Sequence, residues 1–409
     1  MYNNLENIPV DFKADLTVVG GMGHVGLPIS IAFANKNLKV ISYDKNIDNI
    51  KYLKKEKMPF VEYNGDKNLK KSIRNQNIKF TNKLLPNMKG SDFLITVGTP
   101  IDEFQNPSFI EIKKCVDEIL PFVSKKNLIM LRSTIFPGTT DWIEKYVQKI
   151  KPGIKIVFCL ERILQGKAFE ELFTLPQIIA SNSNIGAKKA GKLFKKISPK
   201  IIYCKPKEAE FSKLFCNAFR YIEFAISNQF YVIASKENLD FSNILNLIKQ
   251  SYPRGKNLPS PGFTAGPCLL KDTLQLVSHS QNQFSLGNDA MLINEGLILE
   301  ISKKLQSKFN LNKSKIGLLG MAFKADVDDT RSSLSYKLKK FLQFYAKSVI
   351  TTDPYVKNDS NLLPLSYVLK NSDIIVICVP HKKYKNLKTE KPILDIWNHT
   401  SLKNKKRIL

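Results

Sequence analysis

The sequence predicts an α/β protein in which two doubly wound parallel-sheet domains are joined by a central helical segment with one long helix. Three observations indicate this class. Short buried strands alternate with helical segments in the first half of the chain, and the same alternation restarts after about residue 311. Between these parts, the chain keeps a long helical pattern from about Pro206 to Glu237, with no Gly and no further Pro. Since 409 residues are too many for one ordinary hydrophobic core, we expect domains at residues 1–203, 204–308 and 309–409.

The composition is that of a folded, soluble chain. It is 43% hydrophobic and 24% charged, which excludes a disordered or fibrous protein. No apolar run reaches the roughly 18 residues of a membrane span, and residues 1–6 show no signal-peptide pattern. The six cysteines are scattered without CxxC pairing, which is typical of reduced thiols and not of a disulfide framework or a zinc site. We therefore expect a cytoplasmic protein without a metal site.

The net charge of +27 comes mainly from lysine, because only seven of the 63 basic residues are arginines. The lysines are spread along the whole chain together with many asparagines and isoleucines, a pattern typical of an AT-rich coding sequence. A nucleic-acid-binding surface would instead show a clustered basic patch, often rich in Arg and interleaved with aromatic residues. We therefore expect neither a specific nucleic-acid partner nor a membrane partner.

The first strand and the loop after it carry a dinucleotide-binding pattern. Residues 15–20 read as a buried strand, residues 27–34 follow at helical spacing, and a second strand at 39–43 ends at Asp44. The glycines permit a tight turn, close approach of a pyrophosphate and close packing of helix on strand. An acid at position 44 can accept the ribose hydroxyls of NAD and would repel the 2′-phosphate of NADP, so we expect NAD in a Rossmann-like domain. The loop consists of Gly21, Met22, Gly23, His24, Val25 and Gly26.

Two later strands of the first domain end in small polar loops. The strand at 92–97 precedes Thr99 and Pro100, and the strand at 127–131 precedes a loop that contains Thr134. In an open α/β sheet, ligands bind outside the carboxyl ends of the strands, so both loops are expected beside the cofactor.

A further strand at 155–159 precedes Glu161 and Arg162. The second sheet domain then repeats the alternation of strands and helices. Its second strand in chain order ends at Asp353, as the second strand of the first domain ends at Asp44, so the two domains are similar. Its strands are expected at 315–319, 349–352 and 373–379.

A loop rich in Pro and Gly, residues 259–267, delivers Cys268 to the start of an apparent helix at 269–278. A helix N-terminus and the neighbouring Lys271 both favour the thiolate, and Asp272 lies one turn further along the same helix face. These features predict a reactive cysteine. The other cysteines lie in apolar or helical runs and are expected to be buried small hydrophobic residues. They are Cys115, Cys159, Cys204, Cys216 and Cys378.

The long helix carries a polar stripe, because Lys213, Asn217 and Arg220 are spaced i, i+4 and i+7 among apolar residues. Such a stripe is commonly a solvated face. The same three side-chain types can also hold a sugar hydroxyl and stabilise a developing alkoxide. The spacing alone leaves both interpretations open.

Taken together, these motifs resemble those of the nucleotide-sugar 6-dehydrogenases, the family that includes UDP-glucose, UDP-N-acetylglucosamine and UDP-N-acetylmannosamine dehydrogenases. The resemblance runs from about residue 15 to about residue 397. Eight motifs carry it in order: Gly21–Gly26, Val97–Pro100, Ser133-Thr134 with Pro137-Gly138, Glu161-Arg162, Lys213 with Asn217, Arg254-Gly255, the Cys268 loop, and Gly320–Lys324 with Asp328–Arg331.

The resemblance implies a four-electron oxidation of the C6 alcohol of a UDP-sugar to a carboxylate, with two NAD reduced per product. Cys268 would hold the aldehyde as a thiohemiacetal and then as a thioester, which retains a reactive intermediate on the protein. Lys213 and Asp272 would handle the proton on the C6 oxygen, and Asn217 would stabilise the oxyanion with Lys213. Glu161 would assist hydrolysis of the thioester, and Thr134 is a further catalytic residue that the resemblance implies.

The resemblance also implies which residues bind the ligands. Arg254 would reach the substrate of a neighbouring subunit, so we expect a homodimer or a larger homo-oligomer with a shared active site, serving polysaccharide biosynthesis. Cofactor contacts are implied for residues 21–26, Asp44, Thr99, Pro100, Thr134 and Arg331. Substrate contacts are implied for Arg162, Lys213, Asn217, Arg220, Arg254, Gly262, Phe263, Phe323 and Lys324.

The chain departs from the family pattern at three places. Ala265 stands where the commoner cysteine loop has the first of two glycines, and alanine would be strained there if that position needs a positive φ. Leu160 replaces the usual proline before the glutamate. Gln165 replaces a second glutamate of the UDP-glucose enzymes, and the pair Glu161-Arg162 looks more like the N-acetylhexosamine branch.

We therefore expect a UDP-N-acetylhexosamine 6-dehydrogenase. UDP-glucose 6-dehydrogenase is the alternative within the family. A single-step NAD-dependent hydroxyacid dehydrogenase is a second alternative, although it would leave Cys268 and the second sheet domain without a role. A non-catalytic NAD-binding protein is the third.

Overall fold

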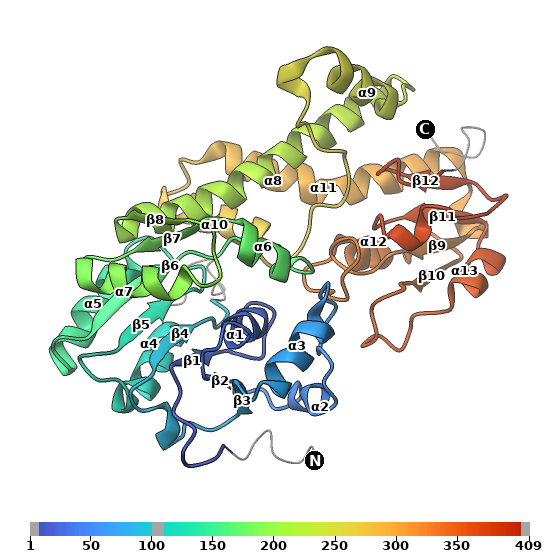
Figure 1. Ribbon diagram of the computed structural model, residues 1–409. Helices are drawn as coiled ribbons and strands as arrows, with labels where there is room; N and C mark the ends of the chain where they lie inside the picture. The colour runs from blue at the N-terminus through green and yellow to red at the C-terminus, as the bar shows by residue number, and fades with distance from the viewer. Residues whose placement is uncertain (1–7, 100–109, 402–409) are drawn as a thin grey trace. The chain divides into compact units, whose positions relative to one another are not determined.

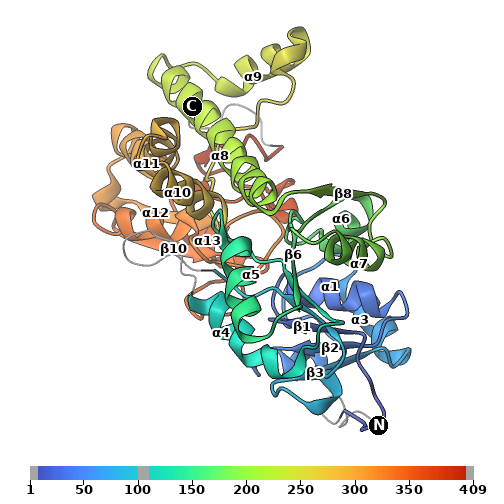
Figure 2. The same ribbon diagram turned by 90° about the vertical axis from the view of Figure 1, so that its left-hand side faces the viewer.

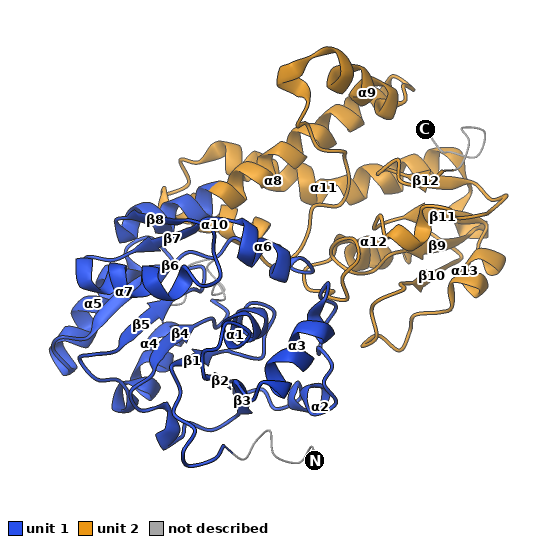
Figure 3. Cartoon of the chain, in the orientation of Figure 1, with its two compact units in different colours: residues 1–215 blue, residues 216–409 orange. Residues whose placement is uncertain are grey.

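The computed structural model describes residues 8–99 and 110–401. The chain forms two compact units, unit 1 at residues 1–215 and unit 2 at residues 216–409 (Figure 3). Each unit has its own parallel sheet and its own hydrophobic core. The finer division into three domains stays a prediction.

Unit 1 is built on an eight-stranded sheet with the order β3-β2-β1-β4-β5-β6-β7-β8 (Figure 1). Neighbouring strands run parallel except β6 and β7, which pair antiparallel. The chain order reverses between β1 and β4, the point at which such sheets open a ligand-binding crevice. The strands are β1 (Leu16–Val19), β2 (Val40–Tyr43), β3 (Ile78–Thr81), β4 (Asp92–Ile95), β5 (Leu128–Leu131), β6 (Lys155–Cys159), β7 (Gln177–Ala180) and β8 (Ile201–Cys204).

The alternation of side chains along the strands builds a core on each face of this sheet. In β4, Leu94 packs into one core, whereas Phe93 and Ile95 pack into the other, because successive strand residues point to opposite faces. Figure 2 shows α4 and α5 on one side and α1 and α3 on the other. The first core is covered by α1 (Gly26–Ala34), α2 (Ile50–Leu53), α3 (Gly65–Arg74), α6 (Ala168–Thr174) and α7 (Asn184–Phe194), and the second by α4 (Ile110–Ile119) and α5 (Thr139–Ile150).

Unit 2 has a four-stranded parallel sheet with the order β10-β9-β11-β12. One face packs against α11 (Ser285–Lys308) and α12 (Leu334–Leu342), and the opposite face packs against α13 (Leu365–Asn371). The strands are β9 (Lys315–Leu319), β10 (Ser348–Thr352), β11 (Ile374–Ile377) and β12 (Ile393–Asp395). Two doubly wound parallel sheets are therefore present, and the predicted fold class is confirmed.

The helical segment between the sheets begins with α8 (Pro206–Lys236), which agrees with the predicted long helix. Pro206 occupies its first position, where a missing N–H costs nothing, and the Glu208 carboxylate accepts a hydrogen bond from the Lys205 N–H at 3.0 Å. The helices α9 (Phe241–Ser251) and α10 (Leu269–His279) follow. Among the described residues, none of the helices has the length and apolar character to span a membrane.

Lys304 on α11 is a partly buried cation inside unit 2. Its Nζ donates to Ser235 Oγ at 2.7 Å and lies 5.3 Å from the centre of the Tyr231 ring. Burial, with a smaller contribution from the charge of Lys308, lowers the pKa of Lys304 to about 8. The folded protein disfavours the charged amine, so Lys304 lowers the free energy of unfolding. This destabilisation has its full size below pH 8 and disappears as the pH rises towards the ordinary lysine pKa of about 10.5.

We predict that Lys304→Met raises the free energy of unfolding at pH 7 by about 1–2 kcal/mol, a value discounted for the partial exposure of the amine. The gain should shrink as the pH rises to about 10.5. Urea denaturation of both proteins at the two pH values measures this difference. Lys303→Met is the matched control, because Lys303 is exposed and only pairs with Glu300 on the surface. An equal gain in the control, or no gain for Lys304→Met, would contradict the account.

Candidate active site

The glycine loop of unit 1 follows β1 and leads directly into α1. A side chain at Gly26 would meet the carbonyl oxygen of Gly20 at 2.1 Å, and one at Gly21 would meet Ser42 Oγ at 2.4 Å, so both positions need glycine for packing. At Gly23 the nearest atom would be 3.5 Å away, which is ordinary contact. The fold itself therefore does not demand glycine at position 23. Glycine is needed there if an anion approaches the backbone closely, because any side chain would keep the anion away. The loop therefore fits the predicted pyrophosphate contact.

Asp44 lies half-buried at the end of β2, beside this loop. Its two carboxylate oxygens accept hydrogen bonds from the backbone N–H groups of Met22 and Asn46, each at 3.0 Å. These bonds fix the direction of the carboxylate and leave lone pairs on both oxygens. The residue therefore suits the predicted contact to the ribose hydroxyls of NAD.

The corresponding acid of unit 2, Asp353 after β10, has a different environment. It is fully buried, accepts from the Met321 N–H at 2.7 Å and lies 3.0 Å from His381 Nε2. Because the Asp326 N–H donates to His381 Nδ1 at 2.9 Å, the imidazole proton sits on Nε2 and is donated to Asp353. Burial alone would raise the pKa of Asp353, but the hydrogen bond from His381, together with those from the Tyr355 and Ala322 N–H groups, lowers it to about 2. This acid is occupied within the protein and does not offer unit 2 a second ribose contact of the same kind.

The loops after β4 and β5 are tied to each other by hydroxyl groups. Ser133 Oγ donates to the Val97 carbonyl at 2.6 Å, and Thr99 Oγ1 donates to the Thr134 carbonyl at 2.5 Å. The predicted cofactor positions Thr99 and Thr134 therefore lie side by side at the carboxyl edge of the sheet. Pro100, the other predicted cofactor residue here, lies outside the described residues.

Glu161 follows β6 and is buried against Arg132, the residue that precedes the β5 loop. Arg132 Nη2 lies 2.5 Å from Glu161 Oε2, and the Ile163 N–H donates to Glu161 Oε1. Arg132 is itself only 2% exposed, and its Nη1 donates to Gln177 Oε1 at 2.8 Å. A buried charge needs a partner, and each of these two charges supplies it for the other. The carboxylate predicted to assist hydrolysis is therefore held in one orientation.

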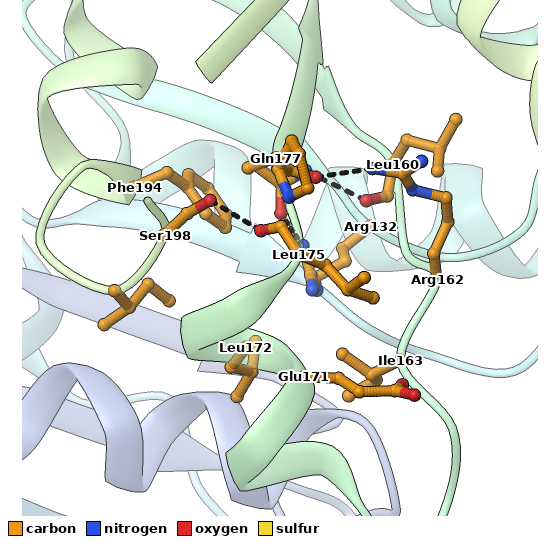
Figure 4. Close-up of a pocket in the computed structure, with 12 residues that line it drawn as sticks. Arg132, Leu160, Arg162, Ile163, Glu171, Leu172, Leu175, Gln177, Phe194 and Ser198 are labelled. Atoms are coloured by element: carbon orange, nitrogen blue, oxygen red, sulfur yellow. Dashed lines mark hydrogen bonds between the residues drawn. The ribbon is translucent and has the colours of Figure 1, made fainter. Parts of the chain in front are cut away.

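Figure 4 shows a small pocket beside this ion pair, with Arg132, Arg162, Gln177 and Ser198 among its lining residues. It has room for about one water molecule, which excludes a nucleotide sugar. Arg162 Nη2 donates to the carbonyl of Pro176 at 2.5 Å, at the end of α6. This cavity is therefore too small to hold the whole substrate.

Two of the sequence departures have clear environments in unit 1. Leu160 is buried in the core at the end of β6, where its N–H bonds the Ile178 carbonyl at 3.2 Å, a bond that proline could not make. Gln165 Nε2 lies 3.1 Å from Nδ1 of His24. The residue that replaces the second glutamate thus contacts the glycine loop.

In unit 2, Cys268 is exposed at the N-cap position of α10, as the sequence predicted. The guanidinium of Arg331 interacts electrostatically with this sulfur. Hydrogen bonds to Asp329, and more weakly the charge of Cys268, raise the pKa of Arg331. The predicted cofactor contact of Arg331 stays a prediction. A helix N-terminus and a guanidinium both favour the thiolate form of a cysteine.

Asp272 lies one turn after Cys268 and is fully buried. Asn217 Nδ2 donates to Asp272 Oδ2 at 2.5 Å, and Lys271 Nζ lies 2.7 Å from Oδ1. Lys271 was expected to act on the thiol, and its ammonium group instead pairs with the Asp272 carboxylate. The polar stripe of α8 is accordingly not uniformly solvated, because its middle residue, Asn217, is buried against this carboxylate.

The cysteine loop is anchored by a buried amide network. Asn228 of α8 pairs with the backbone of Gly262, accepting from its N–H at 2.8 Å and donating to its carbonyl at 3.1 Å. Asn228 also donates to Asn294 Oδ1 at 2.8 Å, and Asn294 Nδ2 donates to the Tyr221 carbonyl at 3.0 Å. Both asparagines are fully buried, so their polar atoms need these partners.

Two glycines of this loop have a positive φ: Gly262, with φ +154°, and Gly266, with φ +105°, where a side chain would meet the Phe323 ring at 2.5 Å. Ala265 is not among the positive-φ residues, so the strain considered for it is absent. Phe323 therefore packs against the cysteine loop at Gly266, and Nζ of the neighbouring Lys324 lies 5.8 Å from the Phe323 ring centre. Phe263 is buried in the core of unit 2.

The remaining predicted residues are more exposed. Lys213 is half-buried on α8 in unit 1, and Arg220 is exposed on the same helix in unit 2. Arg254 is exposed in the turn after α9, where its Nε donates to Tyr252 Oη at 2.6 Å and its guanidinium lies 4.6 Å from the ring centre. This stacking holds the guanidinium extended towards solvent.

Most of the other cysteines are shielded, as expected. Cys159 and Cys378 are fully buried, and burial raises the pKa of each thiol to about 12. Burial also raises the pKa of Cys115, to about 11, and that of the half-buried Cys204. The expectation for Cys216 is wrong, because this residue lies on an outward face of α8 and is exposed.

The sequence interpretation missed the residues that hold the functional loops. Asn228, Asn294, Arg132 and Glu210 are each buried and bonded to segments distant in the chain. The only sequence signal was a polar residue inside an apolar strand or helix pattern. Such a signal marks a buried polar contact but does not identify its partner.

Comparison with known proteins agrees with this arrangement. Three domain models of the UDP-glucose/GDP-mannose dehydrogenase family match in order: the NAD binding domain at residues 14–198, the central domain at 207–296 and the UDP binding domain at 317–401. The UDP-N-acetyl-D-mannosamine dehydrogenase of Methanocaldococcus jannaschii is 31% identical over 94% of this chain and 89% of its own length. The protein of that name from Pyrococcus horikoshii is 29% identical over 90% of both chains.

Solved structures give the same result. The UDP-N-acetyl-D-mannosamine dehydrogenase structure from Pyrococcus horikoshii superimposes with a TM-score of 0.85 at 27% identity, covering 93% of this chain and 94% of that one. A UDP-glucose dehydrogenase from Pyrobaculum islandicum shares the fold with a TM-score of 0.85 at 20% identity, covering 97% and 98%. Because all three domain models match in order and a relative is 31% identical over 94% of the chain, this protein belongs to the UDP-glucose/GDP-mannose dehydrogenase family and is an NAD-dependent nucleotide-sugar dehydrogenase.

Proposed function

We propose that the protein oxidises the C6 alcohol of UDP-N-acetylmannosamine to the uronic acid through a covalent intermediate on Cys268. The observation that carries this proposal is the pairing of an exposed thiol at the start of α10 with the buried Asp272 carboxylate one turn later. A hydroxyacid dehydrogenase or a binding protein would have no use for this pair. The names of the relatives from Methanocaldococcus jannaschii and Pyrococcus horikoshii support the choice of sugar.

The reaction balances as one alcohol, two NAD⁺ and one water giving one carboxylate, two NADH and three protons. Bound NAD supplies the hydride acceptor in both steps. Lys213 and Asp272 take the proton of the C6 hydroxyl, while Asn217 and Lys213 stabilise the oxyanion.

The Cys268 sulfur then adds to the aldehyde carbon. The resulting thiohemiacetal gives up the second hydride of the reaction and its hydroxyl proton and becomes a thioester. Water attacks the thioester carbon, the carbon–sulfur bond breaks, and the thiolate is restored. Glu161 orients that water with the lone pairs that Arg132 and the Ile163 N–H leave free on its oxygens.

Ligand contacts are assigned to each unit separately. In unit 1, residues 21–26 hold the pyrophosphate of NAD, Asp44 takes its ribose hydroxyls, and Thr99 and Thr134 face it from the neighbouring loops. Arg162 and Lys213 of unit 1 are assigned to the substrate, as are six residues of unit 2: Asn217, Arg220, Gly262, Phe263, Phe323 and Lys324. Arg331 is assigned to the cofactor. Gln165, which contacts His24, leaves the position of the second glutamate of UDP-glucose enzymes without a carboxylate.

We also propose that the protein is a homodimer or a larger homo-oligomer in which Arg254 serves a neighbouring active site. Large apolar side chains line one exposed stripe of α8 at spacings of three, four and seven, which is how a helix presents a face to another helix. They are Phe215, Phe219, Ile226, Phe230 and Ile233. The free cysteines agree with a reducing cytoplasm, where UDP-sugar oxidation would serve polysaccharide biosynthesis.

A panel of UDP-sugars tests the function directly. Purified protein is mixed with NAD⁺ and UDP-N-acetylmannosamine, UDP-N-acetylglucosamine or UDP-glucose, and NADH absorbance is followed together with the mass of the product. We expect the highest kcat/KM with UDP-N-acetylmannosamine and a uronic acid as the product. Faster turnover of UDP-glucose would overturn the choice of sugar, and no turnover of any UDP-sugar would overturn the function.

For cofactor choice, we predict that Asp44→Ser raises kcat/KM for NADP relative to NAD by about tenfold or more, because it removes a charge that repels the 2′-phosphate. Initial rates with both cofactors at saturating UDP-sugar measure the ratio. Asp48→Ser is a control, since Asp48 is an exposed acid on the same loop. Equal use of NADP and NAD by the native protein would show that Asp44 does not face the ribose.

For the covalent step, we predict that Cys268→Ala forms no uronic acid but still binds NAD and UDP-sugar with affinities within about threefold of the native protein, since the thiol acts only after the first hydride transfer. Cys268→Ser should accumulate an ester that intact-protein mass spectrometry detects, because an oxygen ester hydrolyses slowly. Cys216→Ala is the matched control on another exposed thiol. Full acid formation by Cys268→Ala would remove Cys268 from the mechanism.

For the shared site, we predict that Arg254→Ala weakens UDP-sugar binding and leaves NAD affinity unchanged. Inactive Arg254→Ala and Cys268→Ala proteins, mixed so that subunits exchange, should regain activity through sites that carry neither lesion. Activity after exchange is compared with that of each variant alone, and native mass spectrometry confirms the exchange. No recovery despite proven exchange would place Arg254 outside the neighbouring site.

A further inference from the structure

Glu210 is a fully buried carboxylate that the proposed reaction does not use. It lies on α8, and its Oε2 accepts from the Gly138 N–H at 2.6 Å. Its Oε1 accepts from the N–H of Thr140 at 2.9 Å and from Thr140 Oγ1 at 2.6 Å. Within residues 8–99 and 110–401 no Lys or Arg forms an ion pair with it. Its buried charge is therefore balanced by these donors and by the N-terminus of α5.

The first turn of α5 requires such an acceptor. The N-cap residue is Gly138, which has φ +96° and no side chain, so it cannot satisfy the exposed N–H groups that begin a helix. A serine or aspartate at that position is the usual local solution. Here the acceptor comes from α8, 70 residues further along the chain. A second element is thereby bonded to the start of α5.

The segment that ends at this cap is the loop that contains Thr134. Its beginning is bonded to the β4 loop through Ser133 and Thr99, and its end is bonded to Glu210. On α8, Lys213 follows Glu210 by three residues, so the two side chains are neighbours on the helix surface. One carboxylate therefore links the predicted cofactor loop to the helix turn that carries Lys213, all within unit 1.

We propose that Glu210 is a positioning residue for the first hydride transfer. It fixes the rotation and the axial position of α8 relative to the Thr134 loop, so that Lys213 and the hydride acceptor face the same carbinol group. This inference rests on the proposed function, in which Lys213 handles the C6 hydroxyl. Because a misplacement of the reacting atoms by about 1 Å can cost about 100-fold in rate, a small shift of α8 slows chemistry more than it weakens binding.

The test is Glu210→Gln, which keeps the size of the side chain but points an NH₂ group at an N–H donor. Thr140→Val is a milder partner variant that removes only the hydroxyl bond from the other side. Glu208→Gln is the matched control, because Glu208 lies in the same turn of α8 and bonds only the Lys205 N–H at the start of its own helix. The readouts are the single-turnover rate of the first NADH formed, the Kd values of NAD and UDP-sugar, and the melting temperature.

We expect Glu210→Gln to lower the single-turnover rate by about 10- to 100-fold, with both Kd values within about threefold of the native protein. Thr140→Val should show a smaller fall of the same kind, and the double variant should lose less than the product of the two falls, because both act on one bond network. Glu208→Gln should retain the native rate.

A Glu210→Gln protein that is folded at the assay temperature and keeps the native single-turnover rate would overturn the inference, whatever its melting temperature, and would show that Glu210 only caps α5. If Glu210→Gln does not fold, Thr140→Val with an unchanged rate overturns it. These outcomes leave native turnover of a UDP-sugar intact, so they are distinct from failure of the proposed function, in which the native protein forms no NADH.

Discussion

The burial of Asp272 is the constraint on which the catalytic part of unit 2 depends. A carboxylate without water must be hydrogen-bonded and paired, and Asp272 obtains both from Asn217 on α8 and Lys271 on α10. This requirement packs α10 against α8 and fixes the start of α10, where Cys268 stands exposed. The buried Asn228 anchors the preceding loop to the same long helix, so the thiol is delivered at a defined place on a rigid element.

The two parallel sheets share one local arrangement of a glycine turn and an aspartate, but the aspartates have different environments. Each first strand is followed by a glycine turn, and each second strand ends in an aspartate that bonds the turn through a methionine N–H. In unit 1 the aspartate stays half-buried and keeps lone pairs for a ligand. In unit 2, the side chain of Asp353 is buried against His381, and the hydrogen bond between them stabilises the ionised carboxylate. Burial and one histidine therefore decide which sheet leaves its aspartate available to a ligand.

The sequence predicted most of this fold because its signals are local. The strand at residues 155–159 and the long helix from Pro206 agree with the structure nearly to the residue, since apolar period and the absence of Gly and Pro determine them. The antiparallel β7 carries no distinguishing pattern and was missed. Likewise, the loop before Cys268 identified this cysteine as reactive. The partners of Asp272 and Glu210 could not be predicted, because tertiary packing between distant segments determines which groups meet a buried carboxylate.

The central claim is that Cys268 carries a four-electron oxidation, and the ratio of NADH formed to sugar consumed tests it most directly. Native protein is given limiting UDP-N-acetylmannosamine and excess NAD⁺, and both quantities are measured at completion. The account predicts two NADH for each sugar, because an alcohol reaches a carboxylate only by losing two hydrides. One NADH for each sugar, with a free aldehyde or ketone as the product, would contradict it.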